Sequence, residues 1–76
     1  MELKMFVEKF SAQFEDTNPE DIKADTVFKD LEEWDSLISL SIIGMIKNTY
    51  NIKVSGEDMK SANTVENLFD LVKARQ

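Results

Sequence analysis

The chain has 76 residues, of which 42% are hydrophobic, so it is long enough for one small globular domain and too hydrophobic for a disordered segment. Its formal net charge is −6, and it contains neither cysteine nor histidine, which excludes thiolate nucleophiles, imidazole bases, disulfides and most transition-metal sites. No apolar run approaches the roughly 20 residues of a membrane span and the N-terminus does not open a secretory signal, so we expect no membrane insertion and a cytoplasmic location.

The negative charge is concentrated in one segment of the chain. Residues 15–35 carry nine acidic residues and two lysines, a net charge of −7, whereas the remaining residues are nearly balanced. Such a field repels nucleic acid and anionic lipid and favours partners with basic surfaces. The alternative is that these acids only keep a small protein soluble.

The first helix and the connection after it can be read from the hydrophobic pattern. Hydrophobic residues recur at steps of three and four over residues 2–14, which predicts an amphipathic helix. Pro19 ends any helix, because the residue before a proline disfavours helical geometry. Residues 15–35 then form a connection that is too long to remain unpacked in a compact domain. Four of its side chains are expected to pack against the core: Ile22, Val27, Phe28 and Leu31. A short turn is expected at 19–23, and Trp34 is expected either to anchor the chain or to border the site that follows.

A second helix is predicted over residues 36–50. Asp35 precedes it, and an aspartate there can cap free backbone N–H groups and suits the positive end of the helix dipole. On a helical wheel the core face holds Ile38, Ile42, Ile43, Met45, Ile46 and Tyr50, with Ser39 and Thr49 among them. Ser36 lies on or next to the exposed face beside Leu37 and Leu40, two leucines that the core does not require. This arrangement indicates a docking surface around an accessible serine.

The C-terminal part is expected to be mostly helical. Residues 51–55 alternate like a short strand, but no partner strand exists, so we expect an extended connector that packs Ile52 and Val54. A short helical turn is expected to start at Ser55 or Gly56.

The last helix has a good N-cap in Thr64 and basic residues Lys73 and Arg75 at its negative end. Its buried stripe is expected to be Val65, Leu68, Phe69 and Val72. The whole chain, residues 1–76, is therefore predicted to be a single all-α domain. We expect a small four-helix bundle of three main helices plus one short helix, with a long first loop.

The candidate chemistry is confined to Ser36. Without histidine the usual serine hydrolase arrangement is impossible, no Ser-x-x-Lys sequence occurs, and the domain is too small for a substrate pocket. A calcium loop that starts at Asp16 fails, because Asp21 stands where a glycine is required and Val27 where a glutamate is required. We therefore expect neither an enzyme nor a metal site, but a serine that another protein's active site modifies.

Three motifs extend over most of the chain, and they read Phe28-x-x-Leu31-x-x-Trp34-Asp35-Ser36-Leu37, Tyr50-Asn-Ile-x-Val54 and Thr64-Val65-x-x-Leu68. Together they resemble the acyl carrier proteins and the related peptidyl carrier domains. The resemblance implies that Ser36 carries 4′-phosphopantetheine through a phosphodiester, with Asp35 as the helix cap beside it. It also implies that a phosphopantetheinyl transferase installs this arm from coenzyme A. The arm's thiol then holds acyl groups as thioesters between the acyl-loading and acyl-transferring enzymes of fatty acid, polyketide or related acyl metabolism.

The sequence also departs from the family. Glu33-Trp34 stands where fatty acid carriers usually have Gly-Ala, and the helix after Ser36 lacks their outward acids. Partner docking is therefore expected at Leu37 and Leu40, with Glu32 and Glu33 steering partners at long range. A monomer is expected. Two alternatives stay open: a peptidyl or aminoacyl carrier, or an unmodified helical interaction module that uses the same leucines.

The hydrophobic pattern of residues 36–50 also suggests where an acyl cargo could bind. The inner arc of the helix over residues 36–50 could part to admit an acyl chain, with Ile38, Ile42, Met45 and Ile46 as its walls. The alternative is that this arc is simply the core.

Overall fold

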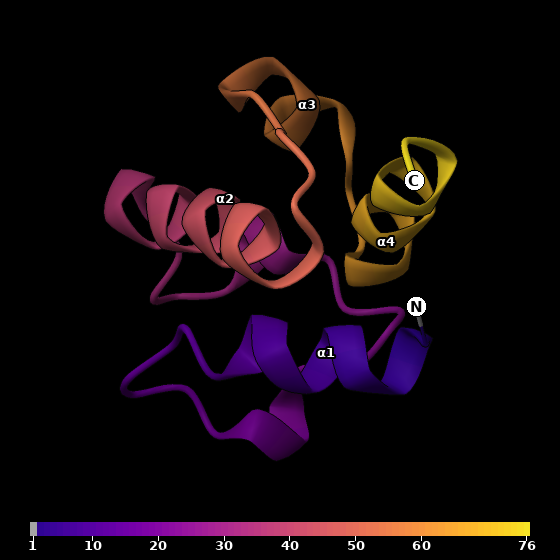
Figure 1. Ribbon diagram of the computed structural model, residues 1–76. Coiled ribbons are helices and arrows are strands. Elements are labelled where there is room, and N and C mark those ends of the chain that lie inside the picture. Colours follow the sequence, from indigo (N-terminus) through magenta and orange to yellow (C-terminus); the bar gives the residue numbers. More distant parts are fainter. Residues whose placement is uncertain (1) are drawn as a thin grey trace.

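Four α-helices form the regular structure of residues 2–76, the part of the chain that the computed structural model describes (Figure 1). They are α1 (Leu3–Ser11), α2 (Ser36–Tyr50), α3 (Gly56–Ser61) and α4 (Val65–Ala74). Two short 3₁₀ turns, Pro19–Asp21 and Phe28–Asp30, lie in the long connection from α1 to α2. Three main helices and one short helix confirm the predicted all-α fold.

Helix α1 is shorter than its hydrophobic pattern predicts. It ends at Ser11 rather than at residue 14, so the predicted boundary is wrong by three residues. The chain continues in a tighter turn, in which the N–H of Phe14 donates to the carbonyl of Ser11 over 3.1 Å. Phe14 is nevertheless buried, because this turn still directs its ring toward the core. The periodicity therefore predicts the burial correctly and the helix end incorrectly.

The long connection is held to the core by three of the four predicted side chains. Ile22 and Phe28 are buried and Leu31 packs partly against the core, but Val27 is 42% exposed, which corrects its predicted role. Val27 instead forms an isolated antiparallel bridge with Thr64 at the start of α4.

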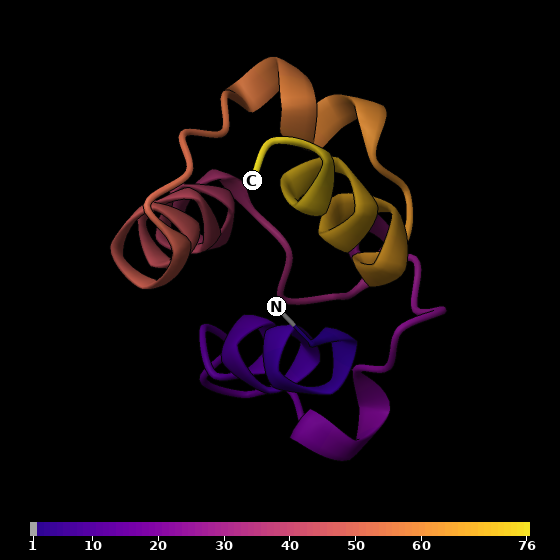
Figure 2. The same cartoon turned by 45° about the vertical axis from the view of Figure 1, so that its right-hand side comes forward.

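Two further backbone hydrogen bonds tie the connection to the start of α4. The N–H of Val65 donates to the carbonyl of Thr26 over 3.2 Å, and that of Glu66 donates to the carbonyl of Ala24 over 2.9 Å. Figure 2 shows the connection passing the first turn of α4 on its way to α2. The connection is thus fixed by backbone pairing at the point where Val27 was expected to fix it by burial.

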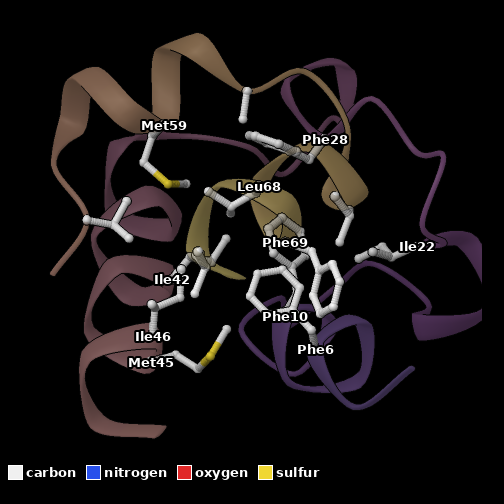
Figure 3. Close-up of a cluster of buried hydrophobic side chains, with 14 of the residues drawn as sticks. Phe6, Phe10, Ile22, Phe28, Ile42, Met45, Ile46, Met59, Leu68 and Phe69 are labelled. Carbon is white, nitrogen blue, oxygen red and sulfur yellow. The ribbon is translucent and has the colours of Figure 1, made fainter. Parts of the chain in front are cut away.

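An aromatic cluster forms the centre of the core (Figure 3). The Phe6 ring of α1 lies 5.6 Å from that of Phe69 of α4, and the Phe10 ring lies 5.4 Å from that of Phe28 in the connection. Such tilted and edge-on pairs stabilise a core beyond the area they bury. The predicted stripe of α4 is confirmed, since all four of its residues are buried: Val65, Leu68, Phe69 and Val72.

Helix α2 divides into the two faces that the wheel predicts. Ile42, Met45 and Ile46 are buried, while three more of its apolar residues pack partly against the core: Ile38, Ile43 and Tyr50. Thr49 is exposed, contrary to prediction, because the fully buried part of α2 ends at Ile46. The helix ends where Asn51 adopts a left-handed conformation with φ of 58°.

The C-terminal part agrees with its predicted elements. Ile52 and Val54 are buried in an extended connector, and both α3 and α4 begin with a capping box, formed by Ser55 with Asp58 and by Thr64 with Asn67.

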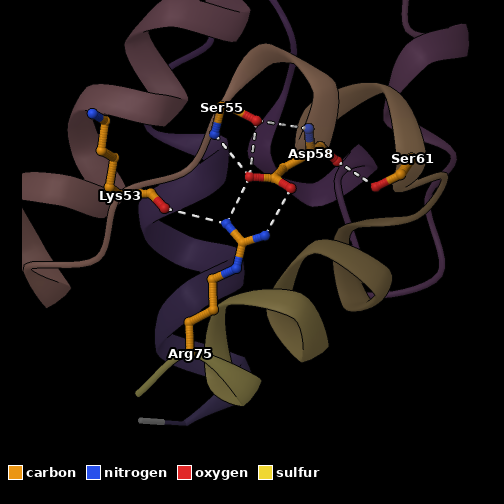
Figure 4. A network of polar contacts seen from close by, with 5 residues as sticks. All are labelled: Lys53, Ser55, Asp58, Ser61 and Arg75. Carbon is orange, nitrogen blue, oxygen red and sulfur yellow. Dashed lines mark hydrogen bonds and ion pairs between the residues drawn. The ribbon is translucent and has the colours of Figure 1, made fainter.

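A polar network then joins α3 to the end of α4 (Figure 4). The Arg75 guanidinium donates to both carboxylate oxygens of Asp58, over 2.6 and 2.8 Å, and to the carbonyl of Lys53 over 3.2 Å. This bidentate pair lowers the pKa of Asp58 far below its usual range. The network links α3 to the end of α4, and α3 also contributes the buried Met59 to the core.

Candidate functional site

Ser36 is the first residue of α2, and its position follows from the aspartate before it. Asp35 has an extended backbone, and its Oδ1 accepts a hydrogen bond of 2.8 Å from the N–H of Ile38. This is the N-cap that the sequence predicts, and it starts the helix at Ser36. Ser36 is exposed, so a second protein can reach its hydroxyl.

Trp34 connects this helix start to the core. Its ring lies 4.8 Å from that of Phe28 and 6.4 Å from that of Phe14, measured between ring centroids. The same side chain lines a cavity together with Ser36. The two roles that the sequence offered for Trp34, core anchor and border of the site, are therefore combined in one residue.

The cavity beside Ser36 has a volume of about 600 Å³ and lies between α2 and α3. Its walls are mostly apolar, and the lining includes Trp34, Leu40, Ile43 and Met59. Lys29 and Lys60 also line it, and the Lys29 ammonium donates to the backbone carbonyl of Lys60. An apolar hollow that adjoins an exposed serine can shelter part of a group attached to that serine.

The cavity does not follow the inner arc of α2. Ile42 and Ile46 are fully buried in the core, so the alternative reading of this arc as plain core fits the structure. The hollow lies on the adjacent face, where Ser39, Leu40 and Ile43 line it. Ser39, predicted on the buried arc, is only half-buried. Sequence reasoning missed the cavity because α3 forms its opposite wall, and nothing in the sequence of α2 shows where α3 lies.

Leu37 and Leu40 flank Ser36 on different sides. Their side chains are 73% and 63% exposed, which confirms the exposed face that the wheel predicts. Leu40 lines the cavity of about 600 Å³, whereas Leu37 lines a smaller one of about 270 Å³ that also includes Ile38. The serine is thus surrounded by accessible apolar surface.

The two glutamates expected to steer partners have different environments. Glu32 is exposed. Glu33 is half-buried, and its carboxylate accepts hydrogen bonds from the turn that follows α1, with Thr17 as one of the donors. The Thr17 hydroxyl is the main cause of a lowered pKa for Glu33, and the backbone N–H groups of residues 15–17 act in the same direction.

Residues 2–76 contain neither a metal-binding cluster nor a membrane-spanning helix. Residues 2–76 contain no group of three or more histidine, cysteine, aspartate or glutamate side chains placed to hold a metal ion. In the same part of the chain, no helix has both the length and the apolar character required to cross a membrane.

The fold and the site together define a class of protein. Residues 2–76 form a small helical bundle that presents Ser36 at the start of α2, beside an apolar hollow. The family model described as a phosphopantetheine attachment site matches residues 7–72. The chain belongs to this family and is a carrier protein with covalently bound 4′-phosphopantetheine as its prosthetic group. No curated protein and no solved structure gives a match.

The residues present fit such a group. The exposed Ser36 hydroxyl is accessible for a phosphodiester, and the start of α2 stabilises negative charge through the helix dipole. The neighbouring hollow offers apolar contact to a chain that extends from the serine. When bound, the arm supplies the thiol that a chain without cysteine lacks.

Proposed function

We propose that Ser36 is the residue that carries the phosphopantetheine arm, and that the protein transports acyl groups as thioesters between the enzymes of a fatty acid, polyketide or related acyl pathway. The observation that supports this proposal is the exposed Ser36 at the start of α2, bordering an apolar cavity of about 600 Å³. A mostly apolar hollow favours an acyl cargo over an aminoacyl one, because polar cargo loses hydrogen bonds with water on entering it.

The protein's own part in the loading step is to present a nucleophile. The Ser36 oxygen forms a bond to the phosphorus on the pantetheine side of the coenzyme A pyrophosphate, the bridging P–O bond breaks, and adenosine 3′,5′-bisphosphate leaves. The serine proton passes to a base of the phosphopantetheinyl transferase, since the carrier has no histidine and needs no base of its own. Asp35 contributes by capping α2, which fixes the residue after it. The protein is therefore proposed to be a substrate of other enzymes and not an enzyme itself.

Partner enzymes are proposed to dock on the surface around Ser36. Leu37 and Leu40 provide exposed apolar contacts on either side of the serine. Glu32 and the other acids of residues 15–35 attract a basic partner surface over a longer range. We also propose that the protein acts as a cytoplasmic monomer. The absence of cysteine is compatible with a reducing compartment, and the net charge of −6 opposes self-association.

Modification followed by intact-mass measurement tests the assignment. The wild-type protein, coenzyme A, Mg²⁺ and a broad-specificity phosphopantetheinyl transferase are expected to give a mass increase of one arm. Ser36→Ala is expected to fold normally, because an exposed hydroxyl contributes little to stability, and to gain no mass. Ser41→Ala, a change of a second exposed serine in the same helix, serves as the matched control and is expected to be modified like the wild type.

The outcomes separate the candidate functions. Full modification of Ser36→Ala would show that the attachment residue is wrong. A wild type that takes up no arm would favour the unmodified interaction module, for which the exposed leucines are the supporting observation. Loading the modified protein with acyl and aminoacyl groups and comparing melting temperatures distinguishes the two carrier types, since only a cargo that contacts the cavity stabilises the fold.

A further inference from the structure

Glu33 makes a concentrated set of hydrogen bonds close to the helix start. Its Oε2 accepts from the N–H of Glu15 over 2.8 Å, and its Oε1 accepts from the N–H of Asp16 over 3.0 Å. The same Oε1 accepts from the N–H and the hydroxyl of Thr17, over 2.9 and 2.7 Å. We call this arrangement of one carboxylate and the turn at residues 15–17 the Glu33 clasp.

The clasp brings a carboxylate into an unfavourable electrostatic environment. The turn itself carries two acidic side chains, those of Glu15 and Asp16, and Glu32 is the preceding residue in the chain. Repulsion from these charges would favour a Glu33 side chain extended into water. Four charge-assisted hydrogen bonds outweigh this repulsion, which is why the carboxylate turns toward the loop.

The clasp lies next to the residues that set the position of Ser36. Trp34 follows Glu33 directly and packs on Phe28 and Phe14. Asp35 follows Trp34 and caps α2 through its bond to Ile38. Anchoring Glu33 to the turn at residues 15–17 therefore restrains the backbone three residues before Ser36. Neither the Trp34 nor the Asp35 side chain makes a hydrogen bond to this turn.

We propose that Glu33 is a positioning residue for Ser36, holding Trp34 and Asp35 through the clasp so that the serine is presented in the geometry that the transferase requires. This inference rests on the proposed function of Ser36 as the attachment residue. It assigns to Glu33 a role through the fold of its own chain, distinct from long-range steering of partners.

Glu33→Gln tests the proposal, because it keeps the size of the side chain and removes the charge that four donors surround. Glu20→Gln is the matched control, since it removes the same charge from the exposed part of the same acidic segment. Thr17→Val removes the hydroxyl donor of the clasp, and Thr17→Ser restores it. Arg75→Gln serves as a stability control, because it breaks a polar network elsewhere in the molecule.

Two measurements are made at a low temperature at which far-ultraviolet circular dichroism shows every variant to be folded. The first is kcat and KM for modification by the transferase, with the carrier varied at saturating coenzyme A. The second is the fluorescence emission of Trp34, the single tryptophan of the chain, before any modification. The emission reports the environment of the helix start without depending on the transferase.

We expect Glu33→Gln to lower kcat by roughly three- to tenfold and to shift the Trp34 emission, because the charged acceptor of four hydrogen bonds is lost. Thr17→Val should change both quantities in the same direction and Thr17→Ser should restore them. Glu20→Gln should change KM alone, and Arg75→Gln should leave both kcat and the emission unchanged.

Two results would overturn the proposal. One is Glu33→Gln with the kcat and the emission of the wild type. Another is an equal loss of kcat in Arg75→Gln, since reduced stability alone would then account for the effect. If Glu33→Gln does not fold, Thr17→Val decides the question by the same two measurements. If the wild type accepts no arm, the attachment at Ser36 is refuted as well. If the wild type is modified and Glu33→Gln has the same kcat and Trp34 emission, only the positioning role is refuted.

Discussion

Lengthening the acyl group carried at Ser36 is expected to raise the melting temperature of the protein. The cavity of about 600 Å³ beside the serine is lined mostly by apolar side chains, among them Ile43 and Met59. An acyl chain that enters it stabilises the folded state, because unfolding returns that chain to water.

The size of the effect can be estimated from the burial of methylene groups. Each methylene removed from water contributes about 0.8 kcal/mol, so the six additional methylenes of an octanoyl group relative to acetyl give an upper bound of about 5 kcal/mol. The cavity is partly open to solvent and its lining includes the exposed Leu40, so we expect roughly half of this, about 2.5 kcal/mol. In a domain of this size about 1 kcal/mol corresponds to roughly 4–8 °C, which predicts an increase of about 10–20 °C.

Thermal unfolding followed by circular dichroism measures the increase. Amide-linked analogues of the acyl arm avoid loss of the cargo by thioester hydrolysis during heating. Ser39→Phe places a ring in the cavity and is expected to abolish the dependence on chain length. Ser41→Phe makes the same change on the exposed face of the same helix and should retain it. A melting temperature that does not change with chain length in the wild type, or that rises equally in Ser39→Phe, would refute cargo binding in this cavity.

The remaining predictions concern docking and stability. Leu40→Ala is expected to speed dissociation of a cognate enzyme, because a leucine fully buried in the complex contributes up to about 1.5–3 kcal/mol to the binding free energy. An unchanged dissociation rate in stopped-flow experiments would show that this leucine lies outside the interface. Glu32→Gln should mainly slow association and weaken its dependence on salt, and an effect confined to dissociation would contradict long-range steering. Arg75→Gln should lower the melting temperature at neutral pH. Because the pKa of Asp58 is depressed in the folded state, the pair stabilises the protein above the ordinary aspartate pKa, and its contribution is lost only as the pH falls toward the depressed value. The melting temperatures of the wild type and Arg75→Gln should therefore converge only in strong acid, and convergence near pH 5 would contradict this account. Phe28→Ala should cost about 3–5 kcal/mol in urea unfolding, because its ring is fully buried between other aromatic rings; a cost below about 1 kcal/mol would contradict its central place in the core.

Features that depend on neighbouring residues could be predicted from the amino-acid sequence alone. The start of α2 follows from Asp35 and Ser36, because an N-cap acts over only three residues of chain. The exposure of Leu37 and Leu40 follows from the helical period of the residues after them. The fold class and the exposed position of Ser36 at the start of α2 were therefore predictable, since they rest on hydrophobic periods and caps within individual helices.

Features that join distant segments became visible only in the folded protein. Val27 is exposed, and its segment is instead held by a backbone bridge to Thr64, far along the chain. The cavity beside Ser36 exists because α3 lies opposite α2, where Met59 of α3 is buried in the core. Glu33 looks like one acid among nine in the sequence, yet its carboxylate binds the turn at residues 15–17. No local pattern shows such a contact, because hydrophobic period and helix capping describe three or four residues at a time, while the fold brings these groups together across the chain.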